Sequence, residues 1–313
     1  MKTILSILLV LLLLTSVSSF GFAEDKIYFC CSMIKEPVLD GKVTDDPAWR
    51  NLPKASDFVV LGISDLASKQ TFFRMGYSAK ALYIGVECKD PEVKEIKAKL
   101  KDMESVWRED SIEVFIFPEN AENYHQFVVN AIGSRFSGTG KGGQKIPLAN
   151  WQAKTYRGKD YWSVEIRIPF KNFALTPKSG EVWTGNIVRN IYTSGDRHTT
   201  WAQIMSVGFH EPVYFGKIIF TKPSKVINLM KKQIATNLKL VSEYKAEISK
   251  KIEDYPSLQK DFAFFLKNHE EIEKKLSQLD TIKKAQFLFK DSQNLLKESK
   301  KLKSKILVEG FFN

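Results

Sequence analysis

Apolar and polar residues alternate with a period of two through most of residues 57–220. The clearest alternating segments are 71–78, 81–88, 110–117, 124–132, 151–157, 161–168, 181–191 and 213–220. Gly, Pro, Asn or Asp stands at nearly every junction between them, as β-turns require. Many short strands with turn signals between them are typical of an all-β sandwich or barrel. Because parallel strands need long crossovers, the short turns predict a mainly β fold, an antiparallel, jelly-roll-like β-sandwich. Its only helical candidate is short, at about 92–104.

A different period begins after Pro223. Apolar residues recur at every third or fourth position from Ile227 to Ile252, which indicates an amphipathic helix. Pro256–Ser257 starts a second helix, and Asp280–Thr281 starts a third that reaches about Ile306. Helices joined by such short breaks predict a C-terminal α-helical hairpin or three-helix bundle. The apolar stripes leave open whether this tail only forms its own core or also pairs, as a coiled coil, with itself or another protein.

The tail is basic. Residues 221–313 carry a net charge of +8 out of +11 for the whole chain. Their lysines are spread around the helices and no arginine is interleaved with them, so a solvated helix surface is the better interpretation and no nucleic-acid partner is expected.

The N-terminus predicts export. Lys2 precedes an apolar run from Ile4 to Leu14, and the small-residue site at 21–23 precedes an acidic pair, as in a signal peptide over residues 1–23. The run is short for a membrane span, which needs roughly 20 residues, so an uncleaved anchor is the second interpretation. No later segment is apolar enough to cross a bilayer. We therefore expect a secreted or periplasmic, cell-envelope protein with a β-sandwich at 24–222 and a Lys-rich helical domain at 223–313.

Three cysteines do not make a disulfide framework. One bridge from Cys30 or Cys31 to Cys88 is an open alternative in an oxidising compartment. There is no Gly-x-Ser-x-Gly, no His-Glu-x-x-His and no phosphate-binding loop, and the four histidines lack metal-ligand spacing. These observations predict a protein that is not an enzyme.

A candidate binding face follows from the alternation. In segment 110–117, Ile112, Val114 and Ile116 must face the core, so Glu113 faces the other way. In segment 124–132, Gln126 and Asn130 share a face in the same manner. A sheet face with a carboxylate, amides and aromatic rings can satisfy sugar hydroxyls, although a merely solvated outer face is an equally good interpretation of the pattern. Glycoside hydrolysis uses two carboxylates, for which Glu113 and Glu165 are the strand candidates.

Six motifs in order resemble the family 9 carbohydrate-binding modules, over about residues 37–220. They are "PVLDGKVTDDPAWRNL" (37–52), "ALYIGVECKDPE" (81–92), "VWREDSIEVFIFPEN" (106–120), "HQFVVNAIG" (125–133), "YWSVEIRIPFKNF" (161–173) and "FHEPVYFGKIIF" (209–220). The resemblance implies a non-catalytic module that binds an oligo- or polysaccharide, commonly in polysaccharide breakdown (carbohydrate catabolism). It also makes a calcium ion possible, although no acidic cluster in the sequence identifies its ligands.

The resemblance also implies site residues. In that family two aromatic rings clamp the sugar, and these positions fall on Trp107 and Phe209, where better-known members have Trp. The family's carboxylate falls on Glu113 and its amide on Asn130, beside Gln126. The usual arginine is replaced by Val128, for which the strand residues Asn186, Arg189 and Asn190 are the candidates to compensate. Trp49, Trp162 and Trp183 are expected in the core.

Two other functions stay open at this point. Related sandwiches carry haem in electron-transfer subunits, with Met and His or Lys as axial ligands, and Met75, Met205 and His210 are available here. The third alternative is a structural protein of the envelope, whose basic helices dock on a partner or on an acidic surface.

Overall fold

The structure of the chain is a computed structural model, which describes residues 26–193 and 195–312. The described residues form two compact units, one of strands and one of helices, and the main break between them falls between Phe220 and Thr221. The predicted signal peptide lies outside the described residues.

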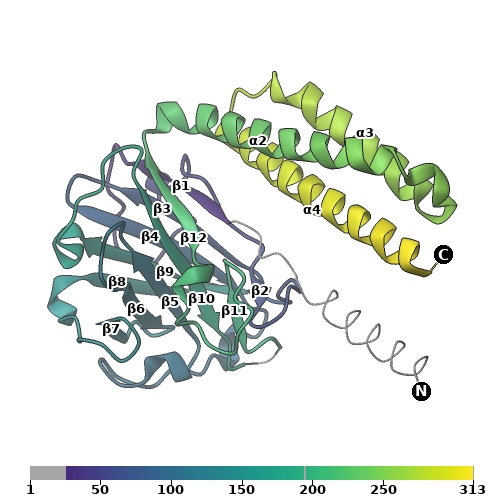
Figure 1. Cartoon of the computed structure of the whole chain (residues 1–313). Helices are drawn as coiled ribbons and strands as arrows, with labels where there is room; N and C mark the ends of the chain where they lie inside the picture. Colours follow the sequence, from purple (N-terminus) through teal and green to yellow (C-terminus); the bar gives the residue numbers. More distant parts are fainter. Residues whose placement is uncertain (1–25, 194, 313) are drawn as a thin grey trace, which may run out of the picture. The chain divides into compact units, whose positions relative to one another are not determined.

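The strand unit holds twelve strands (Figure 1). Eight of them fall in the predicted alternating segments, and the four at residues 27–32, 59–60, 135–139 and 198–200 were not predicted. They are β1 (Ile27–Ser32), β2 (Val59–Val60), β3 (Thr71–Tyr77), β4 (Ala81–Lys89), β5 (Ser111–Phe117), β6 (His125–Asn130), β7 (Arg135–Thr139), β8 (Gln152–Arg157), β9 (Tyr161–Pro169), β10 (Val182–Asn190), β11 (His198–Thr200) and β12 (Gly216–Thr221).

The strands follow one path in the order β7-β6-β5-β10-β12-β1-β3-β4-β9-β8, and β11 lies off this path, where it pairs with β10 and β2. β1 pairs with β3 in parallel, whereas β3–β4, β4–β9, β8–β9, β5–β6, β6–β7, β5–β10, β10–β11, β10–β12 and β2–β11 pair in antiparallel orientation. The predicted mainly β, sandwich-like fold is therefore confirmed, with β1 and β3 as a parallel pair within it. The parallel pair is possible because the long connection from Ser32 to Thr71 gives the chain enough length for a crossover.

The core lies between the two halves of this curled, sandwich-like sheet. One hydrophobic cluster combines Ile112, Val114 and Ile116 of β5 with Ile84 and Val164 of β4 and β9. The tryptophans expected in the core are there, since Trp49, Trp162 and Trp183 are at most 1% exposed. Burial of this kind contributes roughly 25 cal/mol per Å² of apolar surface, so the cluster is the main source of stability for the strand unit.

The helix expected at 92–104 is not formed. Only Val93–Glu95 makes a short 3-10 turn, and the chain then runs irregularly to β5. The backbone N–H of Lys97 donates to Asp110 (2.9 Å), and that of Lys99 donates to Glu109 (2.8 Å). These two carboxylates, just before β5, take the donors that a helix would have directed to its own carbonyl groups.

The helical unit contains α2 (Pro223–Ser249), α3 (Gln259–Leu276) and α4 (Ile282–Phe312), as the apolar period predicted. Buried apolar residues line the contacts of α4 with α2 and α3, among them Ile234, Val241, Phe265, Leu288 and Leu295. Inside this core Asn237 donates to the Ser292 hydroxyl (3.0 Å), and at its surface Lys303 pairs with Glu247. In the part of the chain that is described, no helix is long and apolar enough to cross a membrane.

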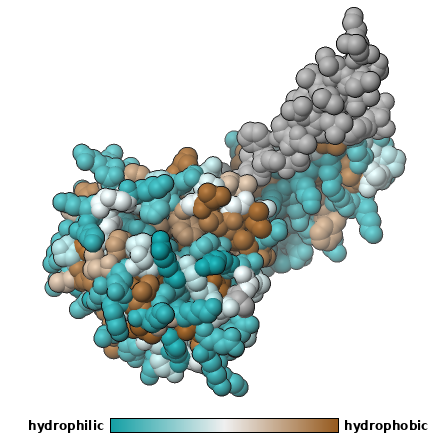
Figure 2. All heavy atoms as spheres, turned by 90° about the horizontal axis from the view of Figure 1, so that it is seen from below, coloured by the Kyte–Doolittle hydropathy of each residue, from teal (hydrophilic) through white to brown (hydrophobic). Residues whose placement is uncertain are grey.

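The surface is mixed rather than apolar. In the view of Figure 2 hydrophilic residues dominate, and hydrophobic ones appear in small groups between them. Singly exposed apolar residues are normal for a folded protein, so most of them need no functional explanation. The chain segment before β12 is of more interest, because it exposes Met205, Val207 and Val213 on either side of Phe209.

Candidate functional site

Glu113 lies on the face of β5 that points away from the core. The register places Val128 of β6 and Val188 of β10 beside it, and residues directly opposite one another in neighbouring strands share a face. The next row on the same face contains Asn130, Ser111, Asn190 and His198, and the row on the other side contains Gln126, Phe115 and Asn186. We call this surface, formed by these residues of β5, β6, β10 and β11, the polar face.

The Glu113 carboxylate is buried at the centre of the polar face, where it is 2% exposed. The Gln126 Nε2 donates to its Oε2 (2.6 Å), and the Asn190 Nδ2 donates to its Oε1 (2.7 Å). Burial raises the pKa of Glu113, while the two amide hydrogen bonds act in the opposite direction. Each carboxylate oxygen therefore already holds an amide, and the amides in turn direct their own carbonyl oxygens away from Glu113.

The same hydrogen bonding continues to β11. The Asn190 Oδ1 lies 2.8 Å from the Nδ1 of His198, and the Asn190 Nδ2 also reaches the Ser111 hydroxyl (3.0 Å). Four side chains on four adjacent strands are thus connected in the order Gln126, Glu113, Asn190 and His198. We call these four residues the polar chain.

Asn130 has a different setting from the one predicted. Its side chain is fully buried, with Nδ2 donating to the Leu100 carbonyl (3.1 Å) and to Glu109 (3.0 Å). Its Oδ1 accepts from the backbone N–H groups of Ile132 and Ser134. Both hydrogens and both lone pairs of the amide are occupied, so Asn130 holds the chain segment that leads to Trp107 rather than offering a free group to a ligand.

Two half-buried aromatic rings flank the polar chain. Trp107, in the turn Val106–Arg108, packs edge-to-face on Phe136 of β7 with ring centres 4.8 Å apart. The register sets Phe136 beside Val128, and Val128 beside Glu113. At the other end Phe209 packs on His198, with ring centres 5.5 Å apart. It also packs against a small buried cluster of Phe115, Tyr124, Val188 and Phe215. Each ring has its own aromatic support; that the two face each other across a sugar remains a prediction.

Two histidines, His198 and His210, lie at the polar face, and the sequence did not identify them as part of it. The sequence pattern assigned neither His198 nor His210 to the candidate binding face. His210 lies over Phe115, and its Nδ1 is 2.6 Å from the Tyr124 hydroxyl. Burial lowers the pKa of both histidines, helped by Arg197 at His198 and by Lys141 at His210. The polar Thr-Thr after His198 gave no strand signal, so nothing in the sequence placed this residue beside Asn190.

Val128 stands where related modules have an arginine, and the residues suggested to compensate for it already have hydrogen-bond or ion-pair partners in the fold. Arg189 is 0% exposed and points away from the polar face. On that opposite side it pairs with Asp90 (2.8 Å). The Asn186 amide is occupied by Thr200 and by the backbone of Ala202. Only Asn190 takes part in the polar chain.

Asp90 also bears on the calcium ion that the resemblance made possible. Lys69 places its ammonium group among Asp90 (2.8 Å), Glu92 and the Thr193 hydroxyl (2.8 Å). An oxygen-rich site that holds a lysine and an arginine already has its cations, so these residues do not fit a calcium ion. Within the described ranges no group of three or more His, Cys, Asp or Glu side chains could hold a metal.

The other strand carboxylate, Glu165, has a structural role. It is 0% exposed and accepts from the Trp49 Nε1 (2.7 Å) and from the backbone N–H groups of Asp40 and Gly41. Gly41 has φ +88° and lies against Thr155, where a Cβ would stand 2.4 Å from a backbone carbon. Glu165 therefore anchors the Asp40–Gly41 turn.

The cysteines and the haem alternative are also clarified. Cys30, Cys31 and Cys88 are free and buried, so the bridge left open by the sequence is not formed. Met75 is 0% exposed inside the core cluster, where it cannot ligate a haem in the folded chain. The other two haem-ligand candidates also have protein partners. The Met205 sulfur accepts a hydrogen bond from the Gln203 amide, and the His210 Nδ1 lies at hydrogen-bond distance from the Tyr124 hydroxyl.

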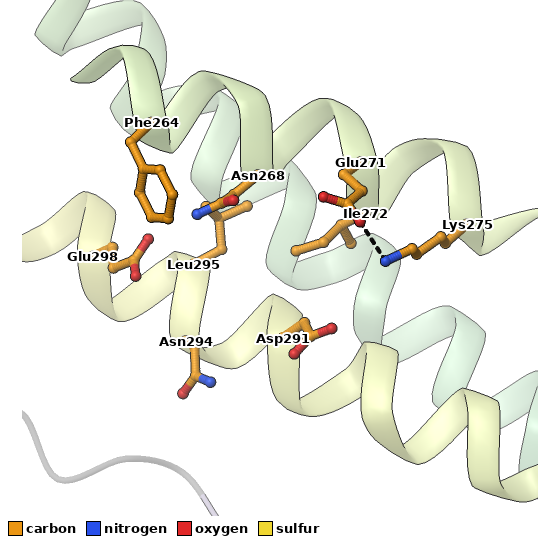
Figure 3. A pocket seen from close by; sticks show the side chains of 9 residues that line it. All are labelled: Phe264, Asn268, Glu271, Ile272, Lys275, Asp291, Asn294, Leu295 and Glu298. Carbon is orange, nitrogen blue, oxygen red and sulfur yellow. Dashed lines mark hydrogen bonds and ion pairs between the residues drawn. The ribbon is translucent and has the colours of Figure 1, made fainter. Parts of the chain in front are cut away.

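The helical unit has a groove of about 290 Å³ between α3 and α4 (Figure 3). Phe264, Ile272 and Leu295 supply its apolar part. Its rim is charged and polar, with Asp291, Glu298 and the ion pair of Glu271 with Lys275. No titratable group that is buried points to a chemical role for this groove.

Comparison with known proteins gives matches for the strand unit. The family model described as "Carbohydrate family 9 binding domain-like" matches residues 39–222. A crystal structure from Bacteroides uniformis ATCC 8492, of a protein assigned to carbohydrate binding, is 17% identical with a TM-score of 0.52, over 62% of this chain and 99% of that one.

Two further solved structures are of a family 9 carbohydrate-binding module from Caldicellulosiruptor kristjanssonii. The complex with glucose is 20% identical, with a TM-score of 0.49, over 63% of this chain and 96% of that one. The complex with cellotriose is 19% identical, with a TM-score of 0.48, over 63% and 94%. No curated protein matches the chain.

Proposed function

We propose that this chain, which belongs to the carbohydrate family 9 binding domain-like family, binds a sugar on the polar face of its strand unit and does not catalyse a reaction. The observation that carries the proposal is the polar chain itself. A buried carboxylate holds two amides in fixed orientation between two aromatic rings, Trp107 and Phe209. Stacked rings and fixed polar groups are what a sugar requires, because a pyranose has apolar faces and a rim of hydroxyls.

The residues have distinct roles in this proposal. Trp107 and Phe209 stack on the sugar, and their aromatic supports Phe136 and His198 limit their movement. The Gln126 Oε1 accepts a hydrogen from a sugar hydroxyl, since its Nε2 is committed to Glu113. Glu113 orients the two amides, and Asn130 holds the segment that carries Trp107. The predicted set is thereby divided into groups that contact the sugar and groups that position them.

The settings of the two strand carboxylates support the absence of catalysis. A glycosidase needs one carboxyl group to transfer a proton and a second to act as base or nucleophile beside the same bond. Glu113 is buried under two amides, and Glu165 is buried under Trp49 and the Asp40–Gly41 turn. Neither carboxylate is free to do either task.

The wider role is part of the proposal. The signal-like residues 1–23 support a secreted or periplasmic, cell-envelope protein. We propose that residues 24–222 are the sugar-binding domain and that the Lys-rich residues 223–313 are a second domain that connects it to its surroundings, by pairing with itself or with another protein. In this setting the protein serves the breakdown of a polysaccharide by holding it.

A glycan array with the full chain tests the proposal. We expect binding to oligosaccharides with accessible neutral hexose or pentose units, equal in calcium and in a chelator. The matched control is Phe209→Ala, which removes one ring from the polar face and should bind none of these glycans. Failure of the wild-type chain to bind any glycan would contradict the proposed function.

A further inference from the structure

His198 has a fixed position beside Phe209. Its half-buried ring meets Phe209 edge-to-face, and it meets Tyr192 in the same manner with ring centres 6.5 Å apart. The pairing of β11 with β10 sets its backbone opposite Asn190, whose Oδ1 reaches the His198 Nδ1 at 2.8 Å. Two ring contacts and one hydrogen bond leave the imidazole little freedom to turn.

The partners of Asn190 determine which of its amide atoms faces His198. The Ser111 hydroxyl uses its hydrogen on the Glu109 carbonyl (3.0 Å), so its oxygen must accept from Asn190. A Glu113 carboxylate oxygen also accepts from Asn190 (2.7 Å). Both contacts require the NH₂ group of Asn190 at this end. The Oδ1 therefore lies at the other end, against His198.

This orientation assigns the proton of the imidazole. Because Asn190 Oδ1 can only accept, the His198 Nδ1 must carry the hydrogen, and in the neutral ring the Nε2 is then a bare acceptor. Burial, assisted by the charge of Arg197, lowers the pKa of His198, so the ring is neutral near pH 7. Among the described residues, no hydrogen bond to the His198 Nε2 is found.

We propose that His198 is a sugar-binding residue, whose Nε2 accepts a hydrogen from a hydroxyl of the sugar unit that stacks on Phe209. The inference rests on the proposed function and adds to it a polar contact at the Phe209 end of the site. It also explains the arrangement of the polar chain. Glu113 and Ser111 fix Asn190, Asn190 fixes the tautomer of His198, and His198 presents its acceptor next to the stacking ring.

Two variants of His198 separate the acceptor from the rest of the side chain. In His198→Asn the amide nitrogen can take the place of Nδ1 and still donate to Asn190, but no atom remains at the Nε2 position. In His198→Gln the longer amide returns an oxygen near that position. We expect affinity about three- to tenfold weaker for His198→Asn, as for one lost neutral hydrogen bond, and partial recovery for His198→Gln.

The probes are neutral mono- and oligosaccharides of glucose, xylose, galactose and mannose, with monodeoxy forms of each, titrated calorimetrically into the full chain. If His198 contacts a hydroxyl, one deoxy sugar will bind the wild type more weakly than its parent sugar does. The His198→Asn variant will bind that deoxy sugar and its parent sugar with equal affinity. If His198 has a purely structural role, His198→Asn will reduce the affinity for all sugars of a series by the same factor.

The outcomes are distinct. Wild-type binding that His198→Asn leaves unchanged, or weakens equally for every deoxy form, overturns this inference and leaves the proposed function standing. A wild-type chain that binds no sugar on either the panel or the array overturns both. The melting temperature of each variant is measured beside the titration, so that loss of fold is recognised as such.

Discussion

The Gln126 amide donates a 2.6 Å hydrogen bond to the Glu113 carboxylate across two adjacent strands, at a place where both side chains are almost fully buried. Because a second amide, from Asn190, occupies the other carboxylate oxygen, Glu113 orients two neutral groups instead of contacting solvent. A carboxylate that accepts from two amides makes the orientation of both amides unambiguous. Most of the expected properties of the site follow from this arrangement.

The first prediction concerns Glu113→Gln. The new amide must place its own NH₂ group against the donor of either Gln126 or Asn190, which leaves buried donors without acceptors. We expect unfolding free energy to fall by about 1–3 kcal/mol and sugar affinity to fall with it. Urea denaturation measures the first effect. Glu122→Gln, at an exposed position before β6, is the matched control and should change neither quantity. An unchanged denaturation midpoint for Glu113→Gln would show that Glu113 does not orient the amides.

A second prediction uses the pKa of His198. Burial and Arg197 hold this pKa below the ordinary histidine value of about 6.5. The Nε2 is therefore an acceptor at neutral pH and becomes a donor only as the pH falls through the lowered pKa. We expect sugar affinity to be constant from pH 8 to 7 and to decline in the acid range below about 6.5.

Other ionisable groups also lie in this region, namely His210, whose pKa is lowered by burial, the buried Glu113, whose pKa is raised by burial, and the Arg197 guanidinium. The decline that belongs to His198 is isolated by comparison with His198→Asn, which should be less sensitive to pH by that amount. Parallel pH profiles for the two proteins would contradict this prediction.

The third prediction concerns metal. Since Lys69 and Arg189 neutralise the oxygen cluster at Asp90, a chelator should leave the melting temperature of the chain unchanged. Lys69→Met removes one of the two cations that pair with the buried Asp90 and leaves Arg189 as its remaining partner, so we expect a loss of about 1–3 kcal/mol. Lys94→Met, at an exposed position in the same region, is the control. A melting temperature that drops in the chelator and returns with calcium would show that a metal site exists after all.

The fourth prediction concerns the thiols. Burial raises the pKa of Cys31 and Cys88 to about 12, and the Cys30 pKa is raised as well. Because the thiolate is the reactive form, the folded chain should react very slowly with a thiol reagent at pH 8. Three thiols should appear once the chain is unfolded in urea without a reducing agent. Fewer than three would reveal a disulfide, and rapid reaction of the native chain would contradict the burial.

The local pattern of apolar and polar residues was enough to predict much of the fold. The alternation in β5 correctly predicted that Ile112, Val114 and Ile116 face the core. The helical period of the tail predicted α2, α3 and α4. The pattern failed where long-range contacts decide. Glu109 and Asp110 take the backbone donors of a segment that resembled a helix, and β1 pairs in parallel with a strand 39 residues further along the chain, from Ser32 to Thr71.

The site was predictable to a similar degree. Alternation was enough to place Glu113 and Gln126 on one face. It could not show that Asn130 is saturated by Leu100, Glu109 and the following turn, because those contacts depend on how a loop folds over the sheet. Nor could it bring His198 to Asn190, since a three-residue polar strand carries no period that can be recognised.

The central claim is that Trp107 is half of a sugar clamp and not a core residue. In Trp107→Ala the half-buried ring loses its edge contact with Phe136, and we expect stability to fall by about 1 kcal/mol or less, near the average for point variants. Sugar binding on the glycan array should be abolished. Trp183→Ala, a core position with 1% exposure, should cost about 3–5 kcal/mol and serves as the reference. Measuring melting and sugar binding on the Trp107→Ala chain separates the two roles most directly. A small loss of stability with no sugar binding is the predicted result, whereas a collapse in stability like that of Trp183→Ala, or unchanged sugar binding, would contradict the clamp.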